Sequence, residues 1–479
     1  MKKIGAIWLA INILFLLCIP TVFASDMEPD QNNSKEQAAN VEFGCYSLDG
    51  KVPVMGSQKI IPNMDAAFLY DVDNETVLYA VNPDTPMYPA SLVKIVTALI
   101  AVEKGNLSDA VTVKENVLST VPKSAVTAHL LPNEIITLEN ALYCMMVGSA
   151  NDAAAVIADH ISGSQEAFVA EMNRLALDLG CTGTNFTNCH GLHDSNQVTT
   201  ARDMAKIVCY AIQNPAFFEI YSTIYYDFPA TNLSESREFT SNNYLMSSMD
   251  NRRLYNDSRV TGGRTGTTED GKRSLAISAA DNGRTLISII MGSANTYNEE
   301  DQSIITFGGF PETSDLLTMG FENYEPRQVL HEGQIFKQCA VQNGENEVVV
   351  GSSESAVSVL PVSISASDLT YRYFDVEDAF VAPVEIGEKL SHVQIWYGNV
   401  CVAQTDLYAM SEVHTAVVNP GVDQTAEENR SFGNALVYIA AVAVGVIAVL
   451  FCIRLVGRLR LAAIKRRGRR YRKSRRRSR

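Results

Sequence analysis

The chain has 479 residues, of which 46% are hydrophobic and 19% are charged, and its formal net charge is −15. Fourteen of the 39 basic residues follow Ile453 and two precede Ala24, while neither end contains an acidic residue, so 23 basic residues face 54 acidic ones between the ends. Such an acidic body argues against nucleic acid as a partner and favours a soluble extracellular part.

The first 24 residues predict a secretory signal peptide. Lys2 and Lys3 precede an apolar stretch from Ile4 to Ile19, and small residues end the segment at Ala24. This order of a positive start, an apolar core and a small-residue exit is typical of a cleaved signal. An uncleaved anchor is the alternative, and a lipoprotein at Cys18 is disfavoured because Leu17 stands where a small residue would be needed.

Residues 25–58 are polar and lack periodicity, which indicates a short leader. The segment 59–324 then alternates between strand and helix patterns. The patterns predict a hairpin around Asp73-Asn74 and later strands at 273–280 and 284–292. Between the hairpin and these strands they predict a helix from Pro89 to Lys104, a helical segment over 138–161 with a break at Gly148-Ser149, and helices at 167–180 and 200–214. Helices inserted between early and late strands favour an α/β (α+β) domain with a largely antiparallel sheet.

The remainder predicts a second domain and a membrane segment. Residues 325–413 alternate with period two and contain the turn signal Gly398-Asn399, which favours a small all-β domain. A linker at 414–434 leads to an uncharged segment at 435–453 that is long enough for one transmembrane helix. The basic tail at 454–479 marks the cytoplasmic side, and membrane anchoring already explains its charges.

Two residues of the first helix do not fit an ordinary packing role. Ser91 and Lys94 lie three apart on one helical face, in front of the apolar residues Ile95, Val96 and Leu99. A serine in the first helical turn could attack a carbonyl while its own N–H holds the resulting oxyanion. It needs a base, and burial lowers the pKa of a lysine toward the neutral form that can act as one. A capping serine with a snorkelling lysine is the structural alternative.

Two later motifs strengthen the catalytic interpretation. Ser149 and Asn151 stand at the helix break in "GSAN", where a hydroxyl could relay a proton and an amide could hold a substrate amide. Arg264-Thr265-Gly266 opens a strand, where a cation and a hydroxyl could take a carboxylate and Gly266 allows close approach. A second "GSAN", residues 292–295, follows the third motif in the chain and is rejected for that reason.

S-x-x-K, S-x-N and a cation-T-G in this order form the pattern of penicillin-binding proteins and serine β-lactamases. The segments "YPASLVKIVTAL", "MMVGSANDAA" and "GGRTGTT" resemble more closely the low-molecular-mass D-alanyl-D-alanine carboxypeptidases. The resemblance covers residues 62–324 and, less specifically, the alternating region after them. It implies a β-lactamase/transpeptidase-like fold and hydrolysis of D-Ala-D-Ala through an acyl-enzyme.

The resemblance also implies roles for individual residues. Ser91 would be the nucleophile, Lys94 its base and Ser149 the proton relay, while Asn151 would clamp the substrate. Arg264, Thr265 and Gly266 would form the carboxylate-binding strand, and Thr267 would supply the second oxyanion N–H. The family usually has lysine at the position of Arg264; arginine holds a carboxylate well but stays protonated.

Other residue patterns are less informative. Cys181 and Cys189 could form a disulfide in an oxidising exterior, and two buried free thiols are the alternative. C-x-x-C and H-E-x-x-H patterns are missing, so neither a zinc site nor any cofactor is expected. His190 and His193 suggest a Ser-His-Asp triad, but a loop-stabilising role is favoured because the sequence has no G-x-S-x-G elbow.

The leading hypothesis is therefore a serine-type D-Ala-D-Ala carboxypeptidase that trims peptidoglycan pentapeptides and reacts covalently with β-lactams. It would be held in a bacterial cell membrane by one C-terminal helix, with an extracellular catalytic domain. The alternatives are a D,D-endopeptidase, a β-lactamase, for which no deacylating glutamate was found, and a catalytically lapsed wall scaffold, which only Arg264 favours.

Overall fold

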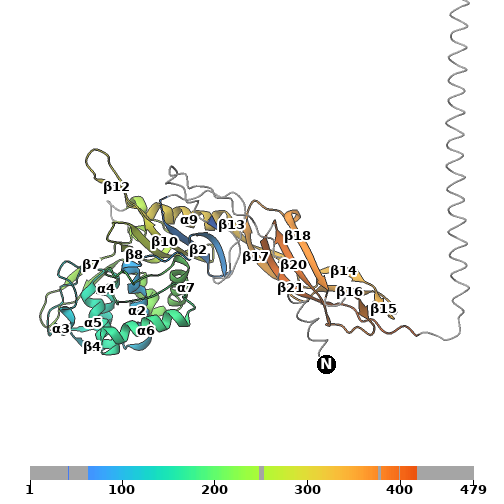
Figure 1. Ribbon diagram of the computed structural model, residues 1–479, viewed down its shortest axis with the longest axis horizontal. Coiled ribbons are helices and arrows are strands. Elements are labelled where there is room, and N and C mark those ends of the chain that lie inside the picture. The colour runs from blue at the N-terminus through green and yellow to red at the C-terminus, as the bar shows by residue number, and fades with distance from the viewer. Residues whose placement is uncertain (1–40, 43–62, 248–252, 376–378, 399, 418–479) are drawn as a thin grey trace, which may run out of the picture. The chain divides into compact units, whose positions relative to one another are not determined.

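The computed structural model describes residues 41–42, 63–247, 253–375, 379–398 and 400–417 (Figure 1). The predicted signal peptide, most of the leader and linker, the predicted span at 435–453 and the basic tail lie outside these ranges. Within them, no helix combines the length and the hydrophobicity that a bilayer crossing requires. By internal contacts the chain divides into two compact units, one of residues 1–337, 350–378 and 387–410 and one of residues 338–349, 379–386 and 411–479.

A six-stranded antiparallel sheet is the centre of the first unit. Its strand order is β1-β3-β2-β10-β9-β8, so strands from the beginning and the end of the predicted first domain lie side by side. The strands are β1 (Val41–Glu42), β2 (Ala66–Asp71), β3 (Thr76–Val81), β8 (Val260–Thr267), β9 (Arg273–Asp281) and β10 (Arg284–Ser293). The predicted hairpin and the two predicted late strands are confirmed, and the leader contributes the short strand β1.

Alternating side chains of the sheet serve two cores. Phe68 and Ile289 point to the helical side, where they join a cluster with α2 (Val93–Lys104), α4 (Leu138–Met146), α5 (Asn151–Ser162) and α7 (Ala201–Ala211). Their neighbours Leu69 and Ile290 point to the other side, against α9 (Phe310–Glu322). Figure 1 shows α9 and the group of helices on opposite faces of the sheet. The period of two in a strand thus gives every central strand two buried faces.

Helix α2 is the central helix of the domain rather than an amphipathic surface helix. Every residue from Val93 to Ala101 is buried, which is why its sequence is apolar on all sides except at Lys94 and Thr97. The helix follows a 3₁₀ turn, η1 (Ala90–Leu92), and ends at Gly105 as predicted. Helices α4 and α7 begin at side-chain caps, for example Thr200 accepting from the N–H of Asp203 at 3.1 Å.

The structure also contains elements that the sequence patterns did not predict. They are mostly short, or lie in ribbons outside the main sheet. They are α3 (Glu115–Leu118), α8 (Pro215–Tyr221), η2 (Tyr244–Met246), η3 (Arg253–Tyr255), and the ribbons β4 (Ala110–Thr112) with β5 (Ile135–Thr137), β6 (Tyr225–Phe228) with β7 (Arg237–Thr240), and β11 (Thr296–Tyr297) with β12 (Ile304–Thr306). The helix predicted at 167–180 is confirmed as α6 (Gln165–Asp178), which starts and ends earlier than expected.

The C-terminal part is all-β, as expected, apart from the 3₁₀ turn η4 (Ala366–Asp368). Its strands are β13 (Tyr324–Leu330), β14 (Ile335–Cys339), β15 (Val341–Gln342), β16 (Val348–Ser352), β17 (Ala356–Pro361), β18 (Leu369–Asp375), β19 (Phe380–Val381), β20 (Lys389–Tyr397) and β21 (Val400–Ala409). They form a five-stranded sheet of order β14-β16-β21-β20-β18 and the pairs β13-β17 and β15-β19.

Candidate active site

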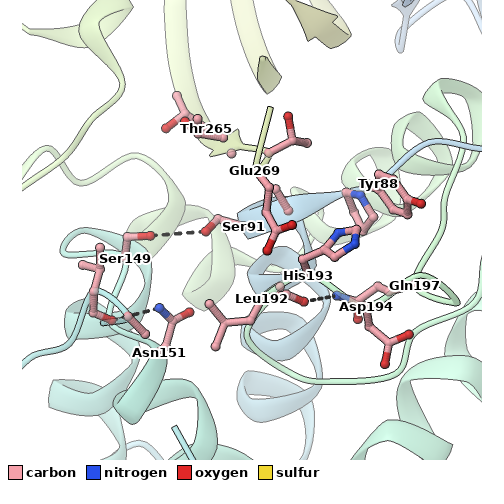
Figure 2. A pocket seen from close by; sticks show the side chains of 18 of the residues that line it. Tyr88, Ser91, Ser149, Asn151, Leu192, His193, Asp194, Gln197, Thr265 and Glu269 are labelled. Atoms are coloured by element: carbon pink, nitrogen blue, oxygen red, sulfur yellow. Dashed lines mark hydrogen bonds between the residues drawn. The ribbon is translucent and has the colours of Figure 1, made fainter. Parts of the chain in front are cut away.

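A cleft on the first unit brings the three predicted motifs together (Figure 2). Ser91 comes from η1, Ser149 from the α4–α5 junction, Asn151 from the first residue of α5, and Thr265, Gly266 and Thr267 from β8. Lys94 and Arg264 do not line the cleft; both are buried behind it, with exposed fractions of 0% and 2%. Residues from three segments distant in the sequence therefore meet at one surface.

Ser91 lies within hydrogen-bond range of two candidate partners. Its Oγ is 3.2 Å from Lys94 Nζ and 3.4 Å from Ser149 Oγ. The residue before it, Ala90, has φ 47° and Ser149 has φ 61°, a region that non-glycine residues rarely occupy. Backbone strain of this kind is concentrated at functional sites, where the surrounding structure maintains it.

Two of the oxygen atoms around Lys94 can only accept hydrogen bonds. Its Nζ donates to Asn151 Oδ1 at 2.8 Å and to the carbonyl oxygen of His190. The Asn151 amide is oriented by Val126, whose carbonyl oxygen accepts from Nδ2 at 2.9 Å, so Oδ1 must face the lysine. A neutral amine has two N–H groups and one lone pair. With both N–H groups used, the lone pair faces the hydroxyl of Ser91.

The surroundings of Lys94 favour this neutral form. Burial is the main cause that lowers its pKa well below the ordinary value, and the charge of Arg264 lowers it further. Cys189 and Asp152 act in the opposite direction and have smaller effects. Burial also lowers the pKa of His190 to about 4, so this imidazole is neutral at pH 7. The lysine therefore fulfils the requirement for a base beside a serine.

Two loops hold this cluster in place. Asp152, the residue after Asn151, is buried and accepts from the N–H groups of Ala128 and Leu130 at 2.8 and 3.1 Å, which fixes the loop of Val126. On the other side, the carbonyl oxygen of Cys189 accepts from Thr97 Oγ1 at 2.6 Å. This bond attaches the loop that contains His190 to α2. The residue that follows the "GSAN" motif, Asp152, therefore has a structural role.

Glycines allow the closest approaches around Ser91. A Cβ atom at Gly266 would lie 3.0 Å from Ser91 N, so β8 passes directly beside the N–H of Ser91. A Cβ atom at Gly191, which has φ 86°, would lie 2.0 Å from the carbonyl oxygen of Ala90. β8 is the last strand of its sheet, and its outer edge faces the cleft. A substrate backbone can add to such an edge by β-type hydrogen bonds.

Arg264 contacts Ser149 rather than the open cleft. Its Nη2 donates to Ser149 Oγ at 2.5 Å and its Nη1 donates to the carbonyl oxygen of Met146 at 2.8 Å. Burial lowers its pKa to about 10, so the guanidinium remains a cation at pH 7. Direct binding of a substrate carboxylate by Arg264 would require the side chain to exchange these partners.

The other sequence-level candidates lie apart from this cluster. Ser293 of the second "GSAN" is at the end of β10 and does not line the cleft. Cys181 and Cys189 are both buried and are not joined in a disulfide, which decides the open question of their pairing. In the described part of the chain, no group of three or more His, Cys, Asp or Glu side chains is arranged to hold a metal ion.

Sequence reasoning missed several residues of the cleft. Figure 2 shows Tyr88, Leu192, His193, Asp194 and Glu269 around Ser91. The rings of Tyr88 and His193 meet edge to face at 4.7 Å. The segment "CHGLHD" was noticed for its histidines, but nothing in the sequence indicates that its loop folds against η1.

Two family models match the chain. The model described as D-alanyl-D-alanine carboxypeptidase matches residues 57–295, and the one described as penicillin-binding protein 5, C-terminal domain, matches residues 324–415. The D-alanyl-D-alanine carboxypeptidase DacA of Haemophilus influenzae is 29% identical over 356 residues, which are 73% of this chain and 84% of that relative. DacF of Bacillus subtilis is 26% identical and covers 73% of this chain and 86% of its own length.

Solved structures lead to the same family. Penicillin-binding protein 5 from Haemophilus influenzae has a TM-score of 0.55 and 28% identity, and the match covers 75% of this chain and 100% of that one. DacD from Francisella tularensis has a TM-score of 0.60 at 20% identity, covers 77% of this chain and 98% of that one, and shows the shared fold alone. The chain belongs to the D-alanyl-D-alanine carboxypeptidase family of penicillin-binding proteins.

Proposed function

We propose that the chain is a serine-type D-Ala-D-Ala carboxypeptidase that removes terminal D-alanine from peptidoglycan stem peptides through an acyl-enzyme on Ser91. The observation that carries this proposal is the contact of Ser91 Oγ with a fully buried lysine amine at 3.2 Å, in a cleft bordered by the edge strand β8. The family match supports the reaction type.

Acylation starts with attack by Ser91 on the carbonyl carbon of the penultimate D-alanine. The Ser91 proton passes to the lone pair of Lys94 as the C–O bond forms. We assign the developing oxyanion to the N–H groups of Ser91 and Thr267. Gly266, which precedes Thr267, has no side chain and so lets β8 pass close to the N–H of Ser91. Preorganised N–H donors of this kind stabilise the transition state by about 2.7–4 kcal/mol each.

Substrate recognition belongs to the residues that line the cleft. Thr265 and Thr267 present hydroxyl groups on the β8 side, and Asn151 lies across from them. We assign the terminal carboxylate to the two threonine hydroxyls, with Arg264 supplying positive charge from behind. The loss of terminal D-alanine leaves an ester that water hydrolyses, with Lys94 as the base. A β-lactam, which is a cyclic amide with a carboxylate, would form the same kind of ester with Ser91.

The test is mass spectrometry of two samples. In the first, stem peptides are incubated with the purified extracellular part, and loss of one alanine mass is the expected result. In the second, a labelled penicillin is trapped on the protein, and the label is expected on the tryptic peptide that contains Ser91. Loss of cross-linked dimers from muropeptides treated in the same way would indicate an endopeptidase. Unchanged peptides together with an unlabelled protein would overturn the proposal in favour of a lapsed scaffold.

We also propose that the enzyme acts outside a bacterial cell, held by the helix predicted at 435–453 with the tail at 454–479 in the cytoplasm. The uncharged span and the basic residues on one side of it support this orientation. A protease added to intact cells is expected to remove the catalytic part and to leave an epitope at the C-terminus protected. Digestion of that epitope from outside would reverse the orientation.

A further inference from the structure

A second cavity, of about 320 Å³, borders the cleft, and the proposed reaction does not use it. Tyr88 and Thr268 line both the cleft and this cavity, so the two meet at these residues. The other lining residues come from the residue before β2, the segment before η1, the β8–β9 turn and the adjoining strand ends. They are Asp65, Pro86, Met87, Val198, Asp270, Lys272, Ser274 and Gly292. A substrate that extends past Tyr88 therefore reaches the second cavity.

The proposed binding mode decides which part of the substrate extends that way. The terminal carboxylate points toward Arg264, so the residues before the attacked carbonyl run in the opposite direction, toward Thr268 just after β8. A peptide that adds antiparallel to the edge of β8 has this polarity and advances about 3.3 Å per residue. Figure 2 shows Tyr88 and Ser149 on opposite sides of Ser91. The residue that precedes D-Ala-D-Ala is thus expected where the cleft meets the second cavity.

The charged residues of the second cavity leave one carboxylate available. Lys272 Nζ donates to Asp65 Oδ2 at 2.5 Å, so these two charges balance each other. Asp270 accepts from the hydroxyl of Thr268, and in the described part of the chain no cation forms an ion pair with it. The hydrogen bond from Thr268 is the main cause that lowers the pKa of Asp270, so this carboxylate is ionised at neutral pH. An ammonium group on a ligand could pair with it.

Carboxylates also line the route from the nucleophile to the second cavity. Asp194 and Glu269 line the cleft, and neither forms an ion pair within the described residues. Together with Asp65 and Asp270, they place four carboxylates against one lysine, Lys272, along the cleft and the cavity. A recess lined mainly by one sign of charge attracts ligands of the opposite sign. The part of the substrate before the attacked carbonyl is therefore expected to be cationic.

We infer that the second cavity binds the side chain of the residue before D-Ala-D-Ala and that this side chain ends in a free ammonium group, an inference that rests on the proposed function. Met87 and Val198 pack against its methylene groups, and Asp270 pairs with its ammonium. A stem peptide whose amine is already acylated in a cross-link has lost this charge and is a poorer substrate. The cavity thus directs the enzyme to stem peptides that are not yet cross-linked through this residue.

The experiment compares kcat/KM of the full-length protein in detergent on two peptides. Both are Nα-acetyl-L-lysyl-D-alanyl-D-alanine, and in one of them the side-chain amine is acetylated as well. The wild type is expected to prefer the free amine about three- to tenfold, since one exposed ion pair is weak and the neighbouring carboxylates add to it. The preference should decrease as the salt concentration rises, because salt screens exposed charges.

Asp270→Asn is the decisive variant. Asparagine keeps an oxygen that can accept from Thr268, so the turn is retained while the charge is lost, and the preference for the free amine should fall to about twofold or less. Asp301→Asn is the matched control, because Asp301 also accepts from a hydroxyl two residues away, that of Ser303 at 2.6 Å, and lines neither the cleft nor the second cavity. This variant should keep both kcat/KM values within about twofold of the wild type.

A third peptide distinguishes two side chains that offer such an ammonium group. Lysine ends in an amine alone, whereas 2,6-diaminopimelate ends in an amine and a carboxylate, and Lys272 could hold that carboxylate. A wild-type preference for the diaminopimelate peptide that Lys272→Met abolishes would support the inference with the zwitterionic side chain as the ligand. A preference for the lysine peptide that persists in Lys272→Met would support it with the simple amine as the ligand.

Equal kcat/KM values on the two lysine peptides in the wild type would overturn the inference, and so would an equal loss on both peptides in Asp270→Asn. In either case wild-type hydrolysis of these peptides would still support the proposed function. Failure of the wild type on every peptide would instead count against the proposed function itself.

Discussion

The region that contains the cleft and the region of the C-terminal β strands differ in the burial of their charged side chains. In the described residues up to Glu322, buried charged side chains include Lys94, Asp152 and Arg264. In the described residues from Tyr324 onward, the buried polar side chains are serines alone, namely Ser352, Ser358 and Ser391. Charged pairs there, such as Lys389 with Asp406, all remain partly exposed, with every side chain at 22% or more.

Within the region that contains the cleft, buried charged side chains differ in whether they form ion pairs. Several buried charged side chains there form ion pairs: Arg284, for example, binds the fully buried Asp71 through two nitrogens at 2.9 and 2.7 Å. Lys94 and Arg264 differ from this pair, because the two basic side chains lie near each other and no carboxylate forms an ion pair with either of them in the described residues. Burying an ionisable group without an ion pair costs free energy. Groups that the protein keeps in this state therefore mark a candidate functional site.

The largest expected effect is that of removing the nucleophile. Ser91→Ala should reduce kcat/KM on a D-Ala-D-Ala peptide on the order of 10⁶-fold, as loss of an acylated serine does in other hydrolases, without lowering the melting temperature. Ser358→Ala is the control: its Oγ donates to Val402 O at 2.8 Å in the β region, so it should cost about 1 kcal/mol of stability and no activity. Activity of Ser91→Ala near that of the wild type would remove Ser91 from the mechanism.

Lys94→Met should reduce kcat/KM by about 10²–10⁴-fold through loss of the base. It also tests the protonation state. Because the folded-state pKa of Lys94 is lowered, unfolding takes up a proton at any pH between that value and the unfolded pKa of about 10.4, so wild-type stability should rise with pH across this window. Below the lowered pKa both states are protonated and the slope vanishes.

The methionine variant lacks this titration. As pH rises, the free energy of unfolding of the wild type should therefore increase relative to that of Lys94→Met. Urea unfolding of both proteins from about pH 7 to about pH 10 measures the difference. Parallel curves over this range would mean that Lys94 is charged in the folded protein, and the neutral-base mechanism would then be wrong.

Core packing should separate the two regions. Leu407→Ala in β21 and Leu99→Ala in α2 each empty a fully buried position and should cost about 2–5 kcal/mol of folding free energy. At a temperature where both variants are folded, Leu407→Ala should keep kcat/KM within about twofold of the wild type. Leu99→Ala should also reduce activity, since α2 carries Lys94. A large loss of activity in Leu407→Ala would show that the β region influences the cleft.

The smallest effect is expected at an exposed ion pair. Lys389→Ala should change the free energy of unfolding by about 0–1 kcal/mol, because Lys389 and Asp406 are both solvated. Arg284→Ala, which leaves Asp71 buried without its partner, should cost about 3–5 kcal/mol. Chemical denaturation of the two variants gives the comparison, and similar costs would mean that burial does not govern these charges.

The sequence by itself determined the local elements and the order of the motifs. The apolar periodicity predicted α2, and the three-residue spacing placed Ser91 and Lys94 on one face, because helical geometry is a local property. The strand alternation predicted β2, β9 and β10 for the same reason. The two short ribbons beside the helices escaped prediction, since such strands depend on pairing with partners remote in the chain.

Only the tertiary structure decided what the site residues contact. The loop of His190 folds onto α2, so the backbone carbonyl oxygen of His190 accepts a hydrogen bond from Lys94. The direction of a backbone carbonyl cannot be read from the residue type. Arg264 was expected to face a substrate carboxylate, yet its nitrogens bind Ser149 and Met146, because β8 passes behind the α4–α5 junction. A pKa, a hydrogen-bond direction and a buried charge are properties of what surrounds a residue, and those surroundings come from segments up to 118 positions apart.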